Sequence, residues 1–342
     1  MLPSRTLVSR ALRRRASLVT APRSAQVSFF SISRISLLPG VFLTCFRHVQ
    51  RFFSTTPSDQ KNDSGSPTIY DGWPGIVNFA NRVRDRIALF ERYENHDVFP
   101  PSMNMLSRYM LFARLQLPTQ TSIDAVEFLN GAQHAVDLAL HTMFSQEVAN
   151  YAFGEVAESP AAQTLQKIMS PMCYDMFYQG VKAMKGTMRT MEMKDLDIKA
   201  VHLAGVTWEK LSVAEIKQQE RDDLIATHEM IKARFMLEKM AKNPTNITKD
   251  LTQIKLTGLT DVDSIVIEDA DHDKMVERLR LDVVTETTEN VVTSTFDDES
   301  EPQSVLRDTA ALWRFESIVT TPDDIDWRIL TFMERPPGAT LP

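Results

Sequence analysis

The spacing of hydrophobic residues changes once along this chain. Between residues 121 and 186, apolar side chains recur every three or four positions, which is the period of a helix with one buried face. From residue 196 onward they alternate in part with polar side chains, as in a strand of a half-buried sheet. Helices followed by a group of strands predict an α+β fold, with N-terminal helices packed on an antiparallel sheet.

Each predicted element has its own local signals. Ser170-Pro171 fits a helix start, because proline is tolerated in the first turn. Thr121-Ser122, with Asp124 and Glu127, fits another start, since a polar cap and acidic residues favour the first turn. We expect helices at 76–94, 103–117, 121–144, 161–168, 171–186 and 215–240. We expect strands at 196–208, 265–267, 275–288, 291–296, 310–319 and 327–332.

The N-terminus has the composition of an organelle-targeting segment. No acidic residue precedes Asp59, whereas nine arginines do, and serine is frequent. An arginine-rich, serine-rich and acid-free start is typical of a mitochondrial presequence, and Arg51-Phe52-Phe53-Ser54 resembles a processing site. We therefore expect a presequence at 1–53, a disordered linker at 54–68 and a helical N-terminal extension at 69–120.

Other targeting signals fit less well. A secretory signal has one clean apolar core, but arginines are scattered through this segment. A transmembrane helix needs about 20 apolar residues, and the best run, 35–46, is shorter and contains Pro39-Gly40. The expected location is the mitochondrial matrix, either in solution or peripheral on the inner membrane.

Charge limits the partners that this chain can bind. Removing residues 1–53 changes the formal charge from −7 to about −16, because nine arginines and no acid are lost. Such a chain opposes nucleic-acid binding unless its basic residues cluster, and we expect no DNA partner. Candidate contacts with anionic lipid or RNA are Arg82, Arg84, Arg86 and Arg92 in one helix, and Lys182, Lys185 and Arg189 in the next helical region. The alternative is an ordinary solvated surface of mixed charge.

Two segments carry a resemblance to a known family. Ala311–Glu316 and Asp326–Leu330 form a predicted hairpin around the turn Thr321–Asp324, and Met169–Phe177 contains a Ser-Pro-x-x-Tyr-x-x-Phe pattern. Together they resemble the Tim-forty-four-like domain over residues 121–333, with a tail at 334–342. The residues that carry the family signature are Ser170, Pro171, Tyr174, Phe177, Trp313, Phe315, Glu316, Trp327 and Arg328.

The resemblance implies a curved, cone-like sheet, as in nuclear transport factor two, and a non-catalytic function. The family includes the scaffold of the inner-membrane import motor, mitochondrial large-subunit ribosomal protein L forty-five and an inner-membrane ribosome receptor. This chain departs from it through a helical insertion at about 213–260. Residues 69–120 are also short and aromatic-rich, rather than rich in Lys and Glu as in the import-motor scaffold.

These departures favour the ribosomal branch of the family. We expect a protein that links the large subunit of the mitochondrial ribosome to the inner membrane, with ribosomal RNA as a further partner. The alternative is a subunit or adaptor of the import motor, which would contact a chaperone and the translocase. A small cavity enzyme of the cone fold is an alternative of another class, with Tyr174, Tyr178, Asp175 and His202 as its candidate residues.

Enzyme and metal motifs are missing from the sequence. It contains no phosphate-binding loop, zinc-protease, serine-hydrolase or kinase signature. Asp269, Asp271 and Asp273 lack the Gly and Glu that a calcium loop needs, so a solvated acidic loop is expected. His134 and His141 fit surface histidines, and Cys173 fits a small core residue. We therefore expect no catalytic residue, cofactor or metal.

Overall fold

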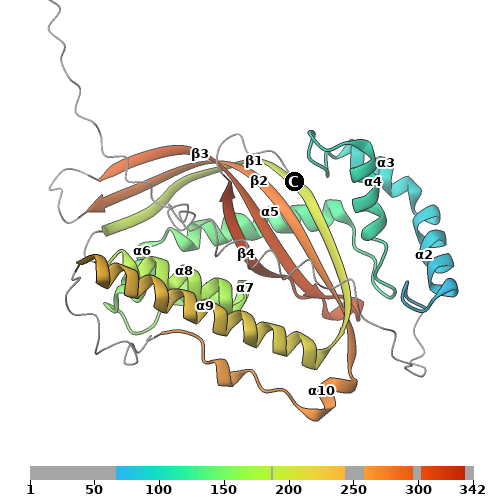
Figure 1. The fold of residues 1–342 in the computed structure, drawn as a ribbon. Coiled ribbons are helices and arrows are strands. Elements are labelled where there is room, and N and C mark those ends of the chain that lie inside the picture. The colour runs from blue at the N-terminus through green and yellow to red at the C-terminus, as the bar shows by residue number, and fades with distance from the viewer. Residues whose placement is uncertain (1–66, 186–187, 243–257, 296–301, 336–342) are drawn as a thin grey trace, which may run out of the picture. The chain divides into compact units, whose positions relative to one another are not determined.

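The computed structural model describes residues 67–185, 188–242, 258–295 and 302–335 (Figure 1). The predicted presequence and residues 54–66 of the predicted linker lie outside these ranges. The principal helices are α2 (Trp73–Asp85), α3 (Ile87–Asn95), α4 (Met105–Arg114), α5 (Ala125–Met143), α6 (Gln146–Phe153), α7 (Pro160–Ile168), α8 (Pro171–Ala183) and α9 (Val213–Lys242). The strands are β1 (Met188–Ser212), β2 (Met275–Thr295), β3 (Gln303–Ile318) and β4 (Arg328–Arg335). Short helices η2 (Val262–Ser264), α10 (Asp269–Asp273) and η3 (Pro322–Asp324) lie in the connections. The predicted α+β class is confirmed.

The four strands form an open antiparallel sheet in the order β1-β2-β3-β4. The β1–β2 pairing extends from Met188 opposite Thr295 to Ser212 opposite Met275 and is interrupted by four register shifts, all of them between residues 188 and 205 of β1. Such irregularities bend a strand and increase its twist, and the bend of these long strands is visible in Figure 1.

The two faces of the sheet differ in chemistry. Leu281 pairs with Phe315 on one face, and the Phe315 ring meets Phe128 of α5 edge-on at 5.6 Å. Because side chains alternate along a strand, their neighbours Asp282 and Arg314 lie on the other face, where they form an ion pair at 2.6 Å. One face therefore carries the apolar core under α5, and the other carries charged residues.

Helix α8 begins against strand β4. Ser170 caps the helix by accepting from the Cys173 N–H at 3.2 Å. Its own N–H donates to Ile329 O at 2.8 Å, and its hydroxyl donates to Leu330 O at 3.1 Å. The Ser-Pro motif therefore starts a helix, and its serine also donates hydrogen bonds to two carbonyl groups of the last strand.

The N-terminal helices pack onto the rest of the fold. The Tyr93 hydroxyl donates to Ile123 O at 3.4 Å and accepts from the Ala125 N–H at 3.1 Å, which joins α3 to the start of α5. The Thr119 backbone N–H and hydroxyl both donate to the buried Glu277 carboxylate on β2. The predicted helical extension is thus helical, and it is attached to the sheet by buried polar contacts.

Several sequence-based boundaries were wrong. The helix predicted at 76–94 is broken at Arg86 (φ −107°, ψ 13°), although the apolar period continues across the break and cannot reveal it. The strands predicted at 275–288 and 291–296 form the single strand β2, as far as the structure describes them. Residues 265–267 form no strand, because β-branched residues need a neighbouring strand to pair with, and Val266 is exposed.

Further corrections concern short elements and ends. Helix α6 was missed, although its signals are Ser145, which caps it, and Gly154, which ends it at φ 76°. Thr68 was placed in the disordered linker but is buried, and its carbonyl lies where a Cβ on Gly75 would clash, which requires glycine there. Glu334 was placed in the tail but belongs to β4, while 336–342 lie outside the described residues.

We predict that Ser170→Ala lowers the free energy of unfolding by about 2 kcal/mol. The variant loses a helix cap and a hydrogen bond to β4, each typically contributing about 1 kcal/mol. Urea unfolding followed by circular dichroism measures the change. Ser107→Ala is the control, since the Ser107 hydroxyl makes no hydrogen bond among the described residues. Equal stability of the two variants would contradict the role given to Ser170.

Candidate functional site

Large exposed apolar side chains concentrate on the N-terminal helices. On α2 they are Trp73, Ile76 and Val77, whose spacing places them on one side of the helix, with Trp73 75% exposed. On α4 they are Met105, Leu106, Tyr109 and Met110. We call these two sets the apolar faces of α2 and α4. Exposed apolar groups gathered in this way mark interaction surfaces more often than scattered ones do.

The charge of this region differs from that of the rest of the chain. Residues 67–120 hold six arginines and five acidic residues, a net charge of +1. Residues 121–342 hold 22 basic and 38 acidic residues, a net charge of −16. The apolar faces of α2 and α4 therefore lie in a segment whose net charge is slightly positive, whereas the rest of the chain after it is acidic overall.

Three of the four arginines predicted as contacts in the first helix bond to groups distant in sequence. Arg82 donates to the backbone oxygens of Gln116 and Leu117, and Arg86 donates to the Gln116 side chain at 2.9 Å. Arg92 pairs with Asp124 at 2.6 Å. Arg84 is exposed and forms an ion pair with the adjacent Asp85 at 3.2 Å. The four arginines therefore do not form one uniform solvent-facing patch, and Arg84 is the best placed of them to meet a partner.

The second basic set is also engaged within the fold. The Lys182 ammonium lies 5.7 Å from the centre of the Tyr178 ring. The Lys185 ammonium donates to Phe153 O at 2.5 Å. Arg189 lies on β1, and its side chain is outside the described residues. Within the described part of the chain, Lys182, Lys185 and Arg189 therefore do not form one exposed basic surface.

The aromatic signature residues lie in the core or at its border. Tyr174 and Phe177 are buried on α8. Trp313 is buried, stacks on Phe332 and donates to the Thr285 hydroxyl at 3.1 Å. Trp327 packs against Phe128 with ring centres 4.7 Å apart. Tyr174, Phe177, Trp313 and Trp327 therefore contribute to packing.

The charged signature residues belong to a network between the sheet and α9. Glu316 accepts from Arg280 at 2.7 Å, and Arg328 lies 3.8 Å from Glu220 of α9. The buried Arg278 donates to Glu209 and to Gln219 of α9. This network holds the long inserted helix against the charged face, because each pair joins groups from different elements.

Burial affects one further carboxyl of this network. It raises the pKa of Asp223 on α9, while the positive charge of Arg280 opposes that rise. Periodicity did not reveal the network, since its members are spread over four strands and a helix. Alternating Arg and Asp or Glu in 278–282 and 314–316 was the sequence signal that could have indicated it.

Of the four residues considered for a cavity enzyme, three lie together on α8, where the rings of Tyr174 and Tyr178 stack 6.0 Å apart, and His202 does not join them. Asp175 is fully buried, accepts from the Thr260 N–H and hydroxyl, and lies 2.9 Å from His228 Nε2. His202 lies elsewhere, with Nδ1 2.7 Å from Asp97 O. Tyr178 packs against Gly258, where a Cβ would lie 2.9 Å from the ring. Asp175 thus fixes the end of the 213–260 insertion and has no free acceptor aimed into a cavity.

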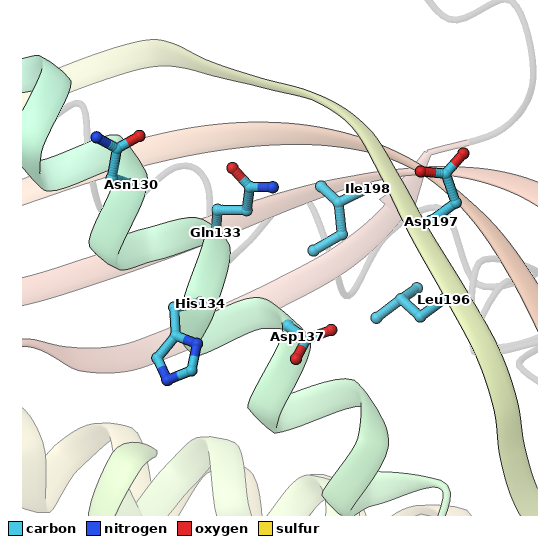
Figure 2. Close-up of a pocket in the computed structure, with 7 residues that line it drawn as sticks. All are labelled: Asn130, Gln133, His134, Asp137, Leu196, Asp197 and Ile198. Carbon is cyan, nitrogen blue, oxygen red and sulfur yellow. The ribbon is translucent and has the colours of Figure 1, made fainter.

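A hollow of about 410 Å³ lies between α5 and β1 (Figure 2). One wall is a row of polar side chains on α5, which we call the polar stripe of α5. The opposite wall is formed by residues 196–198 of β1. The members of the polar stripe are Asn130, Gln133, His134 and Asp137. Gln133 and Asp137 point from α5 toward the strand, whereas His134 points away from it. Leu196 and Ile198 face the helix. The α5 side of the hollow is therefore polar, and the β1 side offers the two apolar side chains Leu196 and Ile198.

The acidic and histidine motifs show no metal site. Asp269, Asp271 and Asp273 lie on α10, so the loop predicted there was wrong, and Asp271 pairs with Lys217 at 2.6 Å. His134 and His141 are exposed on α5, as the sequence predicts. Within the described ranges no group of three or more His, Cys, Asp or Glu side chains is arranged to hold a metal ion.

Comparison with known proteins adds no further assignment. No protein-family profile, curated protein sequence or solved structure matches this chain. Among the described helices, none has the length and apolar character needed to cross a bilayer.

We predict that Cys173 is unreactive in the folded protein. Burial raises the pKa of its thiol to about 12, and the thiolate is the nucleophile. In a Cys45→Ser chain, Ellman's reagent at pH 8 should modify about one thiol per chain in guanidinium and almost none without it. Fast modification of the native protein would contradict the burial of Cys173 on α8.

Proposed function

We propose that this chain is a non-catalytic protein of the mitochondrial matrix, peripheral on the inner membrane, that links the large ribosomal subunit to the membrane. The proposal includes membership of the Tim-forty-four-like family and its cone-like sheet. The carrying observation is the exposure of the apolar faces of α2 and α4 within residues 67–120, whose net charge is +1 against −16 for residues 121–342.

The chemistry of these helices fits a membrane interface. Helices that lie in the interface bury an apolar face among the lipids and place basic residues near the headgroups. Trp73 is the kind of side chain enriched at that depth. The side chain of Arg84 is 73% exposed and can contact anionic headgroups. It would give up its ion pair with Asp85, which is weak because both groups are exposed to solvent.

A non-catalytic function is supported by the polar groups of the fold. Asp175 and Glu277 are buried carboxylates, and both are occupied by hydrogen bonds from the protein. The hollow beside α5 is lined by exposed and half-buried side chains. An active site typically aims polar groups with perturbed pKa values into a cleft, and these groups are engaged in packing or face solvent.

We predict that Leu106→Glu weakens binding to cardiolipin-containing vesicles about tenfold or more. The reason is that a buried leucine typically contributes about 1.5–3 kcal/mol, which a charged side chain forfeits. A chain beginning at residue 54 is used in vesicle flotation, so that the arginine-rich first 53 residues cannot contribute. Leu306→Glu is the matched control, because Leu306 on β3 is 71% exposed and Leu106 is 72% exposed.

Arg84→Glu tests the electrostatic part of the same proposal. It should weaken binding to anionic vesicles and leave binding to phosphatidylcholine vesicles unchanged, and added salt should reduce its effect. Arg82 and Arg86 are unsuitable for this test, since their substitution removes bonds to Gln116. Unchanged flotation of both the Leu106 and Arg84 variants would refute membrane attachment through these helices.

Sedimentation of detergent-solubilised mitochondria tests the partner. Co-migration with the large ribosomal subunit at moderate salt is the expected result. Migration with translocase subunits would replace the ribosomal partner by the import motor. Slow migration with neither the ribosomal subunit nor the translocase would refute the linking function. It would not change the conclusion of the flotation experiment about membrane binding.

A further inference from the structure

Strand β1 is an edge strand whose outer edge accepts backbone partners at two positions ten residues apart. Near one end, Met193 N–H donates to Phe144 O at 2.9 Å. Past the middle of the strand, Leu203 N–H donates to Val98 O at 2.7 Å. Between these two bonds, the described structure shows no backbone hydrogen bond from residues 194–202 to anything other than β2. Alternate N–H and C=O groups of an edge strand point away from its partner, so this stretch presents unpaired backbone groups.

The open stretch coincides with the hollow beside α5. Residues 196–198 form one wall of the hollow, and the polar stripe of α5 forms the other (Figure 2). The register shifts at Met193/Asp195 and Ile198/Ala200 bracket these residues. Such irregularities bend a strand and can redirect its side chains. A helix beside an open edge is the geometry in which peptides add a strand to a sheet.

The side chains around the edge favour a basic occupant. Asp137 faces the strand from α5, and Asp197 lies on the opposite side of β1 at the rim. Asp195, next along the strand, is also exposed. Lys199 is engaged by Asp308 at 2.8 Å, and His141 lies 3.4 Å from Asp137. The carboxylates of Asp137, Asp195 and Asp197 thus lie close to the unpaired backbone of residues 196–198. Leu196 and Ile198 can make apolar contacts with every second side chain of an added strand.

We propose that the groove between α5 and residues 195–201 of β1 binds an extended, basic segment of a partner protein, which adds to the sheet as a fifth strand. Backbone hydrogen bonds to the edge hold the segment. Lysine or arginine side chains meet Asp137 and Asp197, and smaller apolar side chains face Leu196 and Ile198. The hollow of about 410 Å³ lies within the roughly 300–1,000 Å³ range of ligand pockets.

The test begins by selecting nonapeptides from a random displayed library on the full-length chain. The selected peptides should contain basic residues that can point to both faces of the added strand, because Asp137 and Asp197 lie on opposite sides of β1. A synthetic copy of the best peptide should bind at least about tenfold more weakly when alternate backbone nitrogens are N-methylated, because methylation removes the ladder hydrogen bonds. It should also bind at least about tenfold more weakly to an Asp137→Asn/Asp197→Asn chain. Asp323→Asn, an exposed carboxylate in the turn after β3, is the control and should bind normally.

Hydrogen exchange locates the bound peptide. Bound peptide should slow exchange of amides in residues 194–202 and leave those of α2 and α4 unchanged. The proposal is overturned if no peptide is selected, if N-methylation has no effect, or if protection falls on α2 and α4. Selected peptides without basic residues would overturn the assigned occupant. Each of these outcomes is independent of vesicle flotation, so this proposal and the membrane proposal can fail separately.

Discussion

The antiparallel pairing of β1 with β2 is the constraint on which the rest of this fold depends. It joins residues 188–212 to residues 275–295, although a 30-residue helix and a further connection separate them in sequence. The pairing therefore closes a long connection that contains α9, and polar contacts join that helix to the sheet. The Arg278–Glu209–Gln219 contacts and the Asp175–Thr260 contacts lie at two places along the insertion.

Polar contacts in this protein act mainly as internal connections. Glu277 joins the N-terminal segment to β2, Asp175 joins α8 to the insertion, and Ser170 joins α8 to β4. A buried carboxylate is costly unless hydrogen-bonded donors surround it, and each of these groups is satisfied. The two proposed partner surfaces use other groups, on the apolar faces of α2 and α4 and along the open edge of β1.

The charge distribution separates these two surfaces. The N-terminal helices have a small positive net charge, whereas residues 121–342 carry −16. An anionic membrane would attract the first region and repel the second, which would turn the acidic part of the chain toward other partners. A basic peptide would in turn be attracted to the acidic groove beside β1. The two proposals therefore use opposite signs of charge on different elements.

The sequence by itself determined the fold class, most helices and the hairpin of β3 and β4, because periodicity, caps and turn residues act over a few neighbours. Ser170 and Pro171 show this directly, since a cap and a first-turn proline need no distant partner. Tertiary structure decided which arginines remain on the surface, because Arg82 and Arg86 meet Gln116 only after α2 packs beside the end of α4. It also decided that 265–267 is not a strand and that part of the β1 edge stays open. Strand pairing depends on which segments become neighbours in space, and no local pattern records that.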